Sequence, residues 1–282
     1  MSKVAIVTDS TAYIPTELVE KYQITVASNV LIWGDETFED GVDISPTEFY
    51  TRLATATIIP TTSQVAVPTF QKIFEKLHAE GKDILAILLS DQLSKSLNSA
   101  ELARSMVPSA NIEIVNSRSV AMELGFHVLA AAQAAADGAD LQACKTVAEA
   151  AQEKTGVLFV VDTLEFLHRG GRIGGASRFL GTALKLKPLL EVRDGRVEAI
   201  ERIRTKKKAY ERLVELVMER INALEGQVHL ATLHANALED ARGILEMISA
   251  QANPVETIYS EVSPVVGTHC GPGTVGIAYY VA

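Results

Sequence analysis

Short apolar segments alternate with helix-forming segments through the first half of the chain, and this alternation constrains the fold more than any other feature. The apolar runs span residues 4–8, 26–33, 84–90 and 112–116, and their lengths and compositions predict buried strands. Strands separated by helices pair in parallel, because the crossover returns the chain to the same end of the sheet. Residues 1–154 are therefore predicted to form an α/β domain around a parallel sheet.

Helix signals lie between these strands. Ser45 offers an N-cap, Pro46 takes the first helical position and Glu48 completes a capping box, which predicts a helix to about Ala54. Two alanine-rich helices are expected over residues 119–154.

Polar side chains follow three of the predicted strands at the point where each strand ends. They are Asp9-Ser10-Thr11, Ser90-Asp91-Gln92 and Asn116-Ser117-Arg118. In an open parallel sheet, ligands bind outside the carboxyl ends of the strands. We therefore expect a binding site at this edge of the sheet.

The second half of the chain has a different pattern. Strands are predicted at residues 157–161, 189–193, 197–204, 228–234, 255–262 and 275–281, with helices ending near residue 224 and spanning 239–252. Asp194-Gly195 predicts a tight hairpin between two of these strands, because glycine tolerates the positive φ of a primed turn. Residues 155–282 are therefore predicted to form an α+β domain with a mixed sheet, and the boundary is placed between residues 153 and 156.

One segment of this second half, residues 164–184, does not resemble ordinary core. It combines an apolar, helix-like pattern with two glycine pairs and three arginines: Gly170-Gly171, Gly174-Gly175, Arg169, Arg172 and Arg178. Glycine weakens a helix interior by about 0.5–1 kcal/mol relative to alanine. Four glycines within six residues therefore predict a tight bend or a close approach to a ligand or partner.

Positive charge is concentrated around the same segment. Thirteen Lys or Arg and six acids lie between Glu165 and Arg212, so this stretch carries +7 in a chain of formal net charge −9. The remaining −16 would repel a phosphate backbone, which argues against a nucleic-acid-binding protein. The local charge fits an anionic ligand or the acidic face of a partner, and a solvated face with ordinary ion pairs is the alternative.

Three further polar clusters are candidates for a site. Thr61, Thr62 and Ser63 precede a predicted helix, where hydroxyls and helix N-terminal amides together favour an anion. Ser94 lies in a second strand-to-helix junction that is rich in hydroxyls, and His269 lies in a turn rich in glycine and proline. Each cluster alone also fits a simple cap or turn.

Most catalytic and metal-binding patterns are absent from the sequence. It has no glycine-rich phosphate loop and no nucleophile elbow, and its six histidines lack helical metal-binding spacing. Asp9 has no second carboxylate nearby in the sequence for phosphotransfer, and a Cys270 nucleophile beside His269 is a weak alternative. Cys144 and Cys270 are far apart, which argues against a disulfide framework or a thiolate zinc site.

Targeting signals are not evident either. The longest apolar stretch, residues 119–136, is interrupted by Glu123 and His127 and is alanine-rich, so it predicts a buried helix and not a membrane span. The chain opens on a strand-like run with no signal-peptide pattern, and a cytoplasmic protein is expected.

Taken in order, these motifs resemble those of the DegV family of bacterial lipid-binding proteins. The matching segments are residues 7–12, Thr62-Ser63-Gln64, residues 90–100, residues 164–174 with the pattern L-x-x-L-x-R-G-G-R-I-G, and His269-Cys270-Gly271-Pro272-Gly273. The resemblance implies that one long-chain fatty acid is held between an N-terminal domain, residues 1–154, and a C-terminal domain, residues 155–282. It also implies that the protein has no catalytic residues, no metal and no cofactor besides the bound fatty acid.

The resemblance also implies a partner and a set of site residues. In members called FakB, the loaded protein presents the carboxylate of its fatty acid to a separate ATP-using kinase, FakA, which makes the acyl phosphate. Carried onto this chain, Thr62 and Ser94 would hydrogen-bond the carboxylate beside His269. The other residues implied are Thr61, Ser63, Gly170, Gly171 and Arg172 in the ligand site and Arg202 and Arg204 facing the kinase. The chain departs from the family motif at Val65, Asp91 and Lys95, and Lys95 would place a long cation beside the expected carboxylate.

The residues also suggest two alternative functions. Ser94 and His269 would suit a Ser/His hydrolase or esterase acting on an acyl substrate. A transcription regulator is disfavoured by the acidic remainder of the chain and by the lack of a basic helix-turn-helix.

Overall fold

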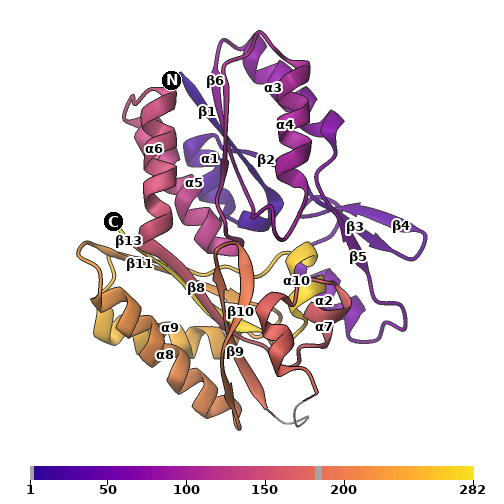
Figure 1. Ribbon diagram of the computed structural model, residues 1–282, viewed down its shortest axis with the longest axis vertical. Helices are drawn as coiled ribbons and strands as arrows, with labels where there is room; N and C mark the ends of the chain where they lie inside the picture. The colour runs from indigo at the N-terminus through magenta and orange to yellow at the C-terminus, as the bar shows by residue number, and fades with distance from the viewer. Residues whose placement is uncertain (1–2, 182–185) are drawn as a thin grey trace.

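A four-stranded parallel sheet is built from the first 116 residues of the protein. The computed structural model describes residues 3–181 and 186–282. The strands lie in the order β2 (Thr25–Ala27), β1 (Val4–Asp9), β6 (Asp83–Leu88) and β7 (Ile112–Asn116). One face is covered by α3 (Val67–Ala79) and α4 (Ser96–Met106), and the other by α5 (Ala121–Ala136) and α6 (Leu141–Ala151) (Figure 1). The buried runs of β1 and β6 form the centre of this sheet, as expected for strands covered on both faces.

A second sheet of six strands is built from the residues after 154. Its order is β10 (Arg196–Ile203), β9 (Lys187–Arg193), β8 (Thr155–Val160), β13 (Val275–Val281), β11 (Val228–His234) and β12 (Glu256–Ile258). Neighbouring strands are antiparallel except β11 and β12, which are parallel. The helices α8 (Lys206–Asn222) and α9 (Leu238–Ala252) cover one face. The predicted fold class, a parallel α/β sheet followed by a mixed α+β sheet, is confirmed.

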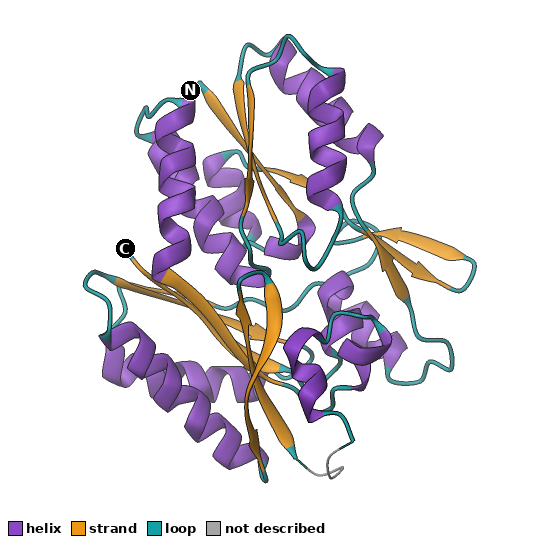
Figure 2. Cartoon of the chain, viewed as in Figure 1, coloured by secondary structure: helices purple, strands orange, loops and turns teal. Residues whose placement is uncertain are grey.

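A small third sheet lies beside the other two, and Figure 2 shows its β3–β4 hairpin projecting from the body of the molecule. It contains β4 (Glu36–Glu39), β3 (Val30–Trp33) and β5 (Thr61–Ser63). The prediction of one strand over residues 26–33 is therefore wrong, because the chain leaves the first sheet after Ala27 and enters the third at Val30. The buried Asn29 amide bonds to Asp9 and Ser10, which separates β2 from β3.

The remaining elements are short or shorter than predicted. They are α1 (Thr16–Tyr22), α2 (Pro46–Leu53), α7 (Glu165–Arg169), α10 (Pro264–Cys270) and three 3₁₀ segments, η1 (Ser10–Ala12), η2 (Gln152–Lys154) and η3 (Gly174–Phe179). The capping box of Ser45 and Glu48 is present at α2, and Asp194 and Gly195 take left-handed φ values in the predicted hairpin. The strand predicted over residues 255–262 is limited to β12, since Ser260 bonds instead to the hydroxyl of Thr232.

Two predictions of local structure around the candidate site are wrong. Thr62 does not lie at a helix N-terminus but on β5, although the helix predicted after it is present as α3, which begins at Val67. His269 does not lie in a turn but in the last turn of α10, and the glycine turn follows it.

The largest apolar core joins the first and second halves of the chain. Leu31, Trp33 and Phe49 from the first half pack in one cluster with residues of β8 and β11 from the second half. All strands of the parallel sheet precede residue 117 and all strands of the six-stranded sheet follow residue 154, so we propose the domain division 1–154 and 155–282. No helix in residues 3–181 and 186–282 combines the length and apolar character needed to cross a membrane.

Candidate functional site

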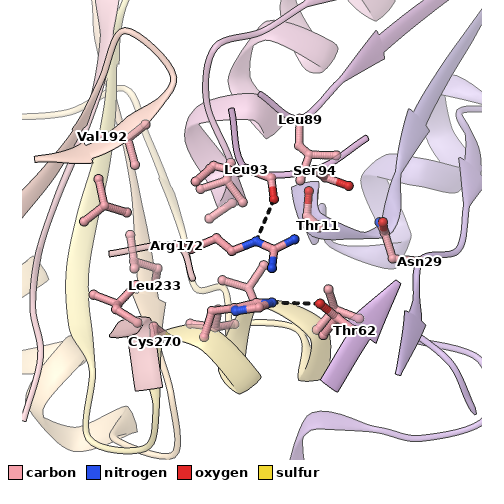
Figure 3. A pocket seen from close by; sticks show the side chains of 18 of the residues that line it. Thr11, Asn29, Thr62, Leu89, Leu93, Ser94, Arg172, Val192, Leu233 and Cys270 are labelled. Atoms are coloured by element: carbon pink, nitrogen blue, oxygen red, sulfur yellow. Dashed lines mark hydrogen bonds between the residues drawn. The ribbon is translucent and has the colours of Figure 1, made fainter. Parts of the chain in front are cut away.

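A cavity lies between the two halves of the chain, and we call it the central cavity. It is lined from Thr11 near the start of the chain to Thr274 near its end, and the space between its walls, solvent at the mouth included, is about 820 Å³. Figure 3 shows polar side chains such as Thr11, Asn29 and Thr62 at one end and the apolar Val192 and Leu233 towards the other. The cavity is therefore amphipathic along its length.

The apolar walls come from one face of the six-stranded sheet. On β8, Val157 and Phe159 line the cavity, whereas the alternate residues Leu158 and Val160 pack under α8 and α9. This division follows from the two-residue period of a strand, which turns successive side chains to opposite faces. The hairpin β9–β10 adds further apolar wall beside β8. A sheet with helices on one face thus leaves its other face available to an apolar ligand.

The polar end is formed by the parallel sheet and β5. Ser94 lies in the loop between β6 and α4, at the carboxyl edge where the polar triplets predicted a site. Thr62 is opposite the buried Leu31 in the β3–β5 pairing and faces inward, while its neighbour Thr61 is exposed. Ser63 and Gln64 also line the cavity.

Thr62 forms a close pair with His269. The Oγ1 atom of Thr62 lies 2.8 Å from Nε2 of His269 (Figure 3), while the buried Nδ1 has no hydrogen-bond partner among the described residues. Burial, with the nearby Arg172 charge as the second cause, lowers the pKa of His269 to about 4, so the ring is neutral at pH 7. A proton on Nε2 is favoured, because an unsatisfied lone pair on Nδ1 is tolerated better than an orphaned buried N–H. His269 then donates to Thr62 and leaves the Thr62 hydroxyl hydrogen for the cavity.

Arg172 crosses from the second half of the chain to the first. Its Nε donates to the carbonyl of Leu93 at 2.9 Å (Figure 3). Its Nη1 donates to the carbonyl of Gly170 at 2.7 Å. Both partners are neutral, so within the described residues the guanidinium lines the cavity without a carboxylate partner. An anion at the polar end would meet this charge.

The two glycines before Arg172 do not line the cavity, but Gly170 supports it. A Cβ on Gly170 would lie 2.1 Å from Nδ1 of His269, so only glycine allows the imidazole to occupy its place against Thr62. Gly171 has φ +71 and permits the chain to turn towards Arg172. The glycine pairs predicted a close approach of the backbone to a ligand or partner. At Gly170 the group that the backbone approaches is the side chain of His269 in the same protein.

A buried hydrogen-bond network supports Ser94 from behind. The hydroxyl of Ser94 lies 3.2 Å from that of Ser96, which donates to Oδ1 of Asn29, and Asn29 in turn donates to Asp9. Burial raises the pKa of Asp9, and its carboxyl also accepts from the Thr11 hydroxyl and from the backbone N–H of Leu89. Asp9 is therefore saturated with structural hydrogen bonds.

The structure brings five of the candidate ligand residues together at the central cavity: Thr62, Ser63, Ser94, Arg172 and His269. It places Thr61 on the outer side of β5 and Lys95 on the surface at the start of α4. Thr11, from one of the polar triplets predicted at this edge of the sheet, also lines the cavity. Sequence reasoning missed Asn29 as a lining residue, although the polar interruption at Ser28-Asn29 in an apolar run was a usable signal.

The two arginines expected to face a partner do not line the central cavity. Arg202 on β10 is exposed and its guanidinium stacks 4.9 Å from the ring centroid of Phe179, and Arg204 is exposed one residue beyond β10. Lys185, one of the thirteen basic residues, and residues 182–184 of the glycine and arginine segment lie outside the described residues. No group of three or more His, Cys, Asp or Glu within the described ranges is placed to hold a metal ion.

A parallel α/β sheet joined to a mixed α+β sheet around an amphipathic cavity is the architecture of a known family of proteins. A family model described as an uncharacterised protein family, DegV, matches residues 3–282, and the chain belongs to the DegV family. A DegV domain-containing protein of Clostridium acetobutylicum is 38% identical over 98% of this chain and 97% of its own length. Another of Halalkalibacterium halodurans is 36% identical over 100% of this chain and 99% of its own length.

Solved structures of the family agree with this fold. A fatty-acid-binding DegV family protein of Thermus thermophilus superposes with a TM-score of 0.93 at 31% identity, with all of both chains covered. DegV of Bacillus subtilis, described as a fatty acid binding protein, gives 0.90 at 33% identity with the same full coverage.

Proposed function

We propose that this protein binds one long-chain fatty acid in the central cavity, with the acyl chain along the apolar walls and the carboxylate at Thr62 and Ser94. The observation that carries the proposal is the convergence of two hydroxyls, a neutral histidine and an uncompensated arginine at one end of an apolar cavity. The fatty-acid binding described for the relatives from T. thermophilus and B. subtilis supports the same ligand class.

The two ends of the cavity would contribute differently to binding. About 15 methylenes at ~0.8 kcal/mol each give on the order of 12 kcal/mol gross, before the cost of ordering the chain is subtracted. The carboxylate would receive hydrogen bonds from Thr62 and Ser94, and Arg172 would balance its charge. The apolar walls therefore supply affinity, and the polar end fixes the direction in which the ligand enters.

We further propose that the protein is a carrier that presents the carboxylate to a separate ATP-using kinase of the FakA type. The exposed arginines Arg202 and Arg204 lie in the basic stretch that follows the glycine and arginine segment, where they would meet an acidic or nucleotide-bearing partner. A cytoplasmic location fits this role.

A hydrolase that uses Ser94 and His269 is not supported by the geometry. The Nε2 atom of His269 is bonded to Thr62, and the hydroxyl of Ser94 is bonded to Ser96. The Nδ1 atom has no acid to orient it in the described part of the chain, whereas a serine nucleophile needs a base that a third group holds in place.

Extraction of the purified protein with organic solvent, followed by mass spectrometry, tests the carrier proposal. About one long-chain fatty acid per chain should be released, because the apolar cavity retains the ligand through purification. Protein that arrives empty, takes up no added fatty acid and cleaves activated acyl esters would instead support the hydrolase.

Thr62→Ala and Ser94→Ala should each weaken fatty-acid binding by about one to two orders of magnitude, because a hydrogen bond to a charged group contributes about 1.5–3 kcal/mol. Equilibrium titration with a fluorescent fatty acid measures the change. Thr61→Ala is the matched control, since it removes the same hydroxyl from the outer side of the same strand and should leave the affinity unchanged. Unchanged affinity in both inward variants would refute the assignment of this polar end.

Replacing Arg202 or Arg204 with alanine should leave fatty-acid retention nearly intact while slowing acyl-phosphate formation by a FakA-type kinase with ATP. Exposed interface charges act mainly on the association rate, and added salt should imitate the substitution. Arg104→Ala removes an exposed arginine from α4 in the other half of the molecule and serves as control. Loss of lipid from the Arg202 and Arg204 variants would assign these arginines to the ligand site instead.

A further inference from the structure

One buried carboxylate, Asp40, connects the two walls of the polar end of the central cavity. It follows β4 in the first half of the chain and is only 1% exposed. Its backbone N–H donates to the carbonyl of Asn29 at 2.9 Å, which holds it beside the network that supports Ser94. Neither the sequence motifs nor the proposed binding residues include it.

The carboxyl of Asp40 has partners on both sides. On one side Oδ2 accepts from the hydroxyl of Ser10 at 2.7 Å, and Ser10 accepts from the side chain of Asn29 at 3.2 Å. On the other side Oδ1 accepts from the backbone N–H of Val265 at 3.2 Å, in the first turn of α10. Asp40 is therefore the direct polar connection between the Asn29 network and the helix that carries His269.

The bond between Asp40 and Val265 affects the ligand site because Val265 and His269 belong to the same short helix, α10. Val265 and His269 are four residues apart and lie on the same face of the helix, one turn from each other. Asp40 fixes the first turn, and the 2.8 Å contact of His269 with Thr62 fixes the last. A helix of two turns held at both ends cannot rotate without breaking one of these contacts.

We propose that Asp40 is a positioning residue for the carboxylate site. Asp40 holds α10 so that His269 contacts Thr62 and both face Ser94 on the opposite wall. The inference rests on the proposed fatty-acid site and adds a residue that does not touch the ligand. Its consequence is selective: loss of Asp40 should harm recognition of the headgroup and spare the acyl walls, which are formed by the sheet.

Equilibrium binding of cis-parinaric acid and of its methyl ester, measured by fluorescence, separates these two effects. The two probes share the acyl chain and differ in the anionic headgroup. In Asp40→Ala the affinity for the acid should fall by about tenfold or more, and the affinity for the ester should change by less than about threefold, because the ester makes little use of a carboxylate site. The ratio of the two affinities is thus the readout, and general loosening of the fold would not change it.

Two further variants and a control complete the design. Asp40→Asn keeps a carbonyl oxygen for the Val265 N–H and should restore most of the preference for the acid. Ser10→Ala removes the side-chain link between Asp40 and Asn29 while Asp40 remains, and it should lower the same ratio. This variant also provides the test if Asp40→Ala does not fold. Asp43→Ala, which removes an exposed carboxylate bonded to the N–H of Glu39 in the same loop, should leave the ratio unchanged.

The outcomes distinguish this inference from the proposed function. A wild-type protein that binds neither probe would refute the fatty-acid site itself. The positioning role alone would be overturned if the wild-type protein prefers the acid and the Asp40→Ala and Ser10→Ala variants keep that preference. It would also be overturned if both variants lose affinity for the acid and for the ester equally.

Discussion

A Val197→Trp variant should purify almost free of fatty acid while remaining folded. Val197 lies on β10 opposite Val192 of β9, is 5% exposed and lines the central cavity. An indole at this position would occupy space that the acyl chain needs, and each excluded methylene removes ~0.8 kcal/mol of transfer free energy. Exclusion of four methylenes would lower the affinity by about 3 kcal/mol, more than about a hundredfold.

The measurement is the molar ratio of extracted fatty acid to protein, together with the melting temperature. Because the indole enters existing empty space, the variant should melt close to wild-type protein from which the lipid has been removed. Val197→Ala enlarges the cavity at the same place and should retain its ligand. A full lipid load in Val197→Trp would mean that the acyl chain lies elsewhere, and the proposed binding site would be wrong.

The stability of the protein should fall as the pH rises from 6.5 to 8, and Glu123→Gln should remove much of that fall. Glu123 lies in the first turn of α5, is buried, and accepts hydrogen bonds from the hydroxyls of Ser119 and Thr155. Burial is the main reason that its pKa is raised from 4.5 to about 8, and the charge of Glu191 adds to the effect.

The sign follows from proton linkage. Between the unfolded pKa of 4.5 and the folded pKa of about 8, the folded protein holds a proton on Glu123 that the unfolded chain has released. Stability contributed by this proton is fully present below pH 4.5 and is lost as the pH rises through 8, by up to ~1.4 kcal/mol per unit. His127 and His269, whose pKa values burial lowers to about 4, act in the opposite direction, but only below 6.5.

Urea unfolding at pH 6.5, 7.2 and 8 gives the slope for each variant. Burial raises the pKa of Asp40 to about 6, which adds slope of the same sign at the lower end of this range, so the comparison with Glu123→Gln isolates the contribution of Glu123. Glu113→Gln is the control, because the ammonium of Lys145 lowers the pKa of Glu113 and keeps it ionised throughout this range. Equal slopes in wild type and Glu123→Gln would contradict a protonated Glu123 at neutral pH.

The sequence predicted the two larger sheets well, because most of their strands carry local signals, whereas it missed the small sheet of β3, β4 and β5. Alternation of apolar runs and helices identified the parallel sheet, and the positive φ allowed at Gly195 identified the β9–β10 hairpin. The carboxyl edge of the parallel sheet was a correct location for polar side chains that line the cavity, since Thr11 and Ser94 both lie there.

The parts of the site that sequence reasoning missed depend mostly on contacts between distant residues. His269 is helical although glycines surround it, because Ser263 caps α10 and Pro264 takes its first position, a local signal that was overlooked. Gly267 leaves room for Tyr50, whose hydroxyl would lie 2.4 Å from a Cβ there. Thr62 faces the cavity and Thr61 does not, because pairing with β3 sets the register of β5. In the sequence Asn29 looked like an ordinary strand residue. Its role in the buried network depends on hydrogen bonds to Ser10 and Asp9, which lie 19 and 20 residues earlier.

The position of β13 has a consequence for when the protein can acquire its ligand. This strand is the last in chain order, yet it lies in the middle of the six-stranded sheet between β8 and β11, and α10 with His269 comes directly before it. Before β13 pairs, β8 can bond only to β9 and β11 only to β12, so the two parts of the sheet are not joined. The wall of the cavity is therefore complete only after β13 has joined the two parts, and a partly folded chain without β13 lacks the surface that a lipid would need.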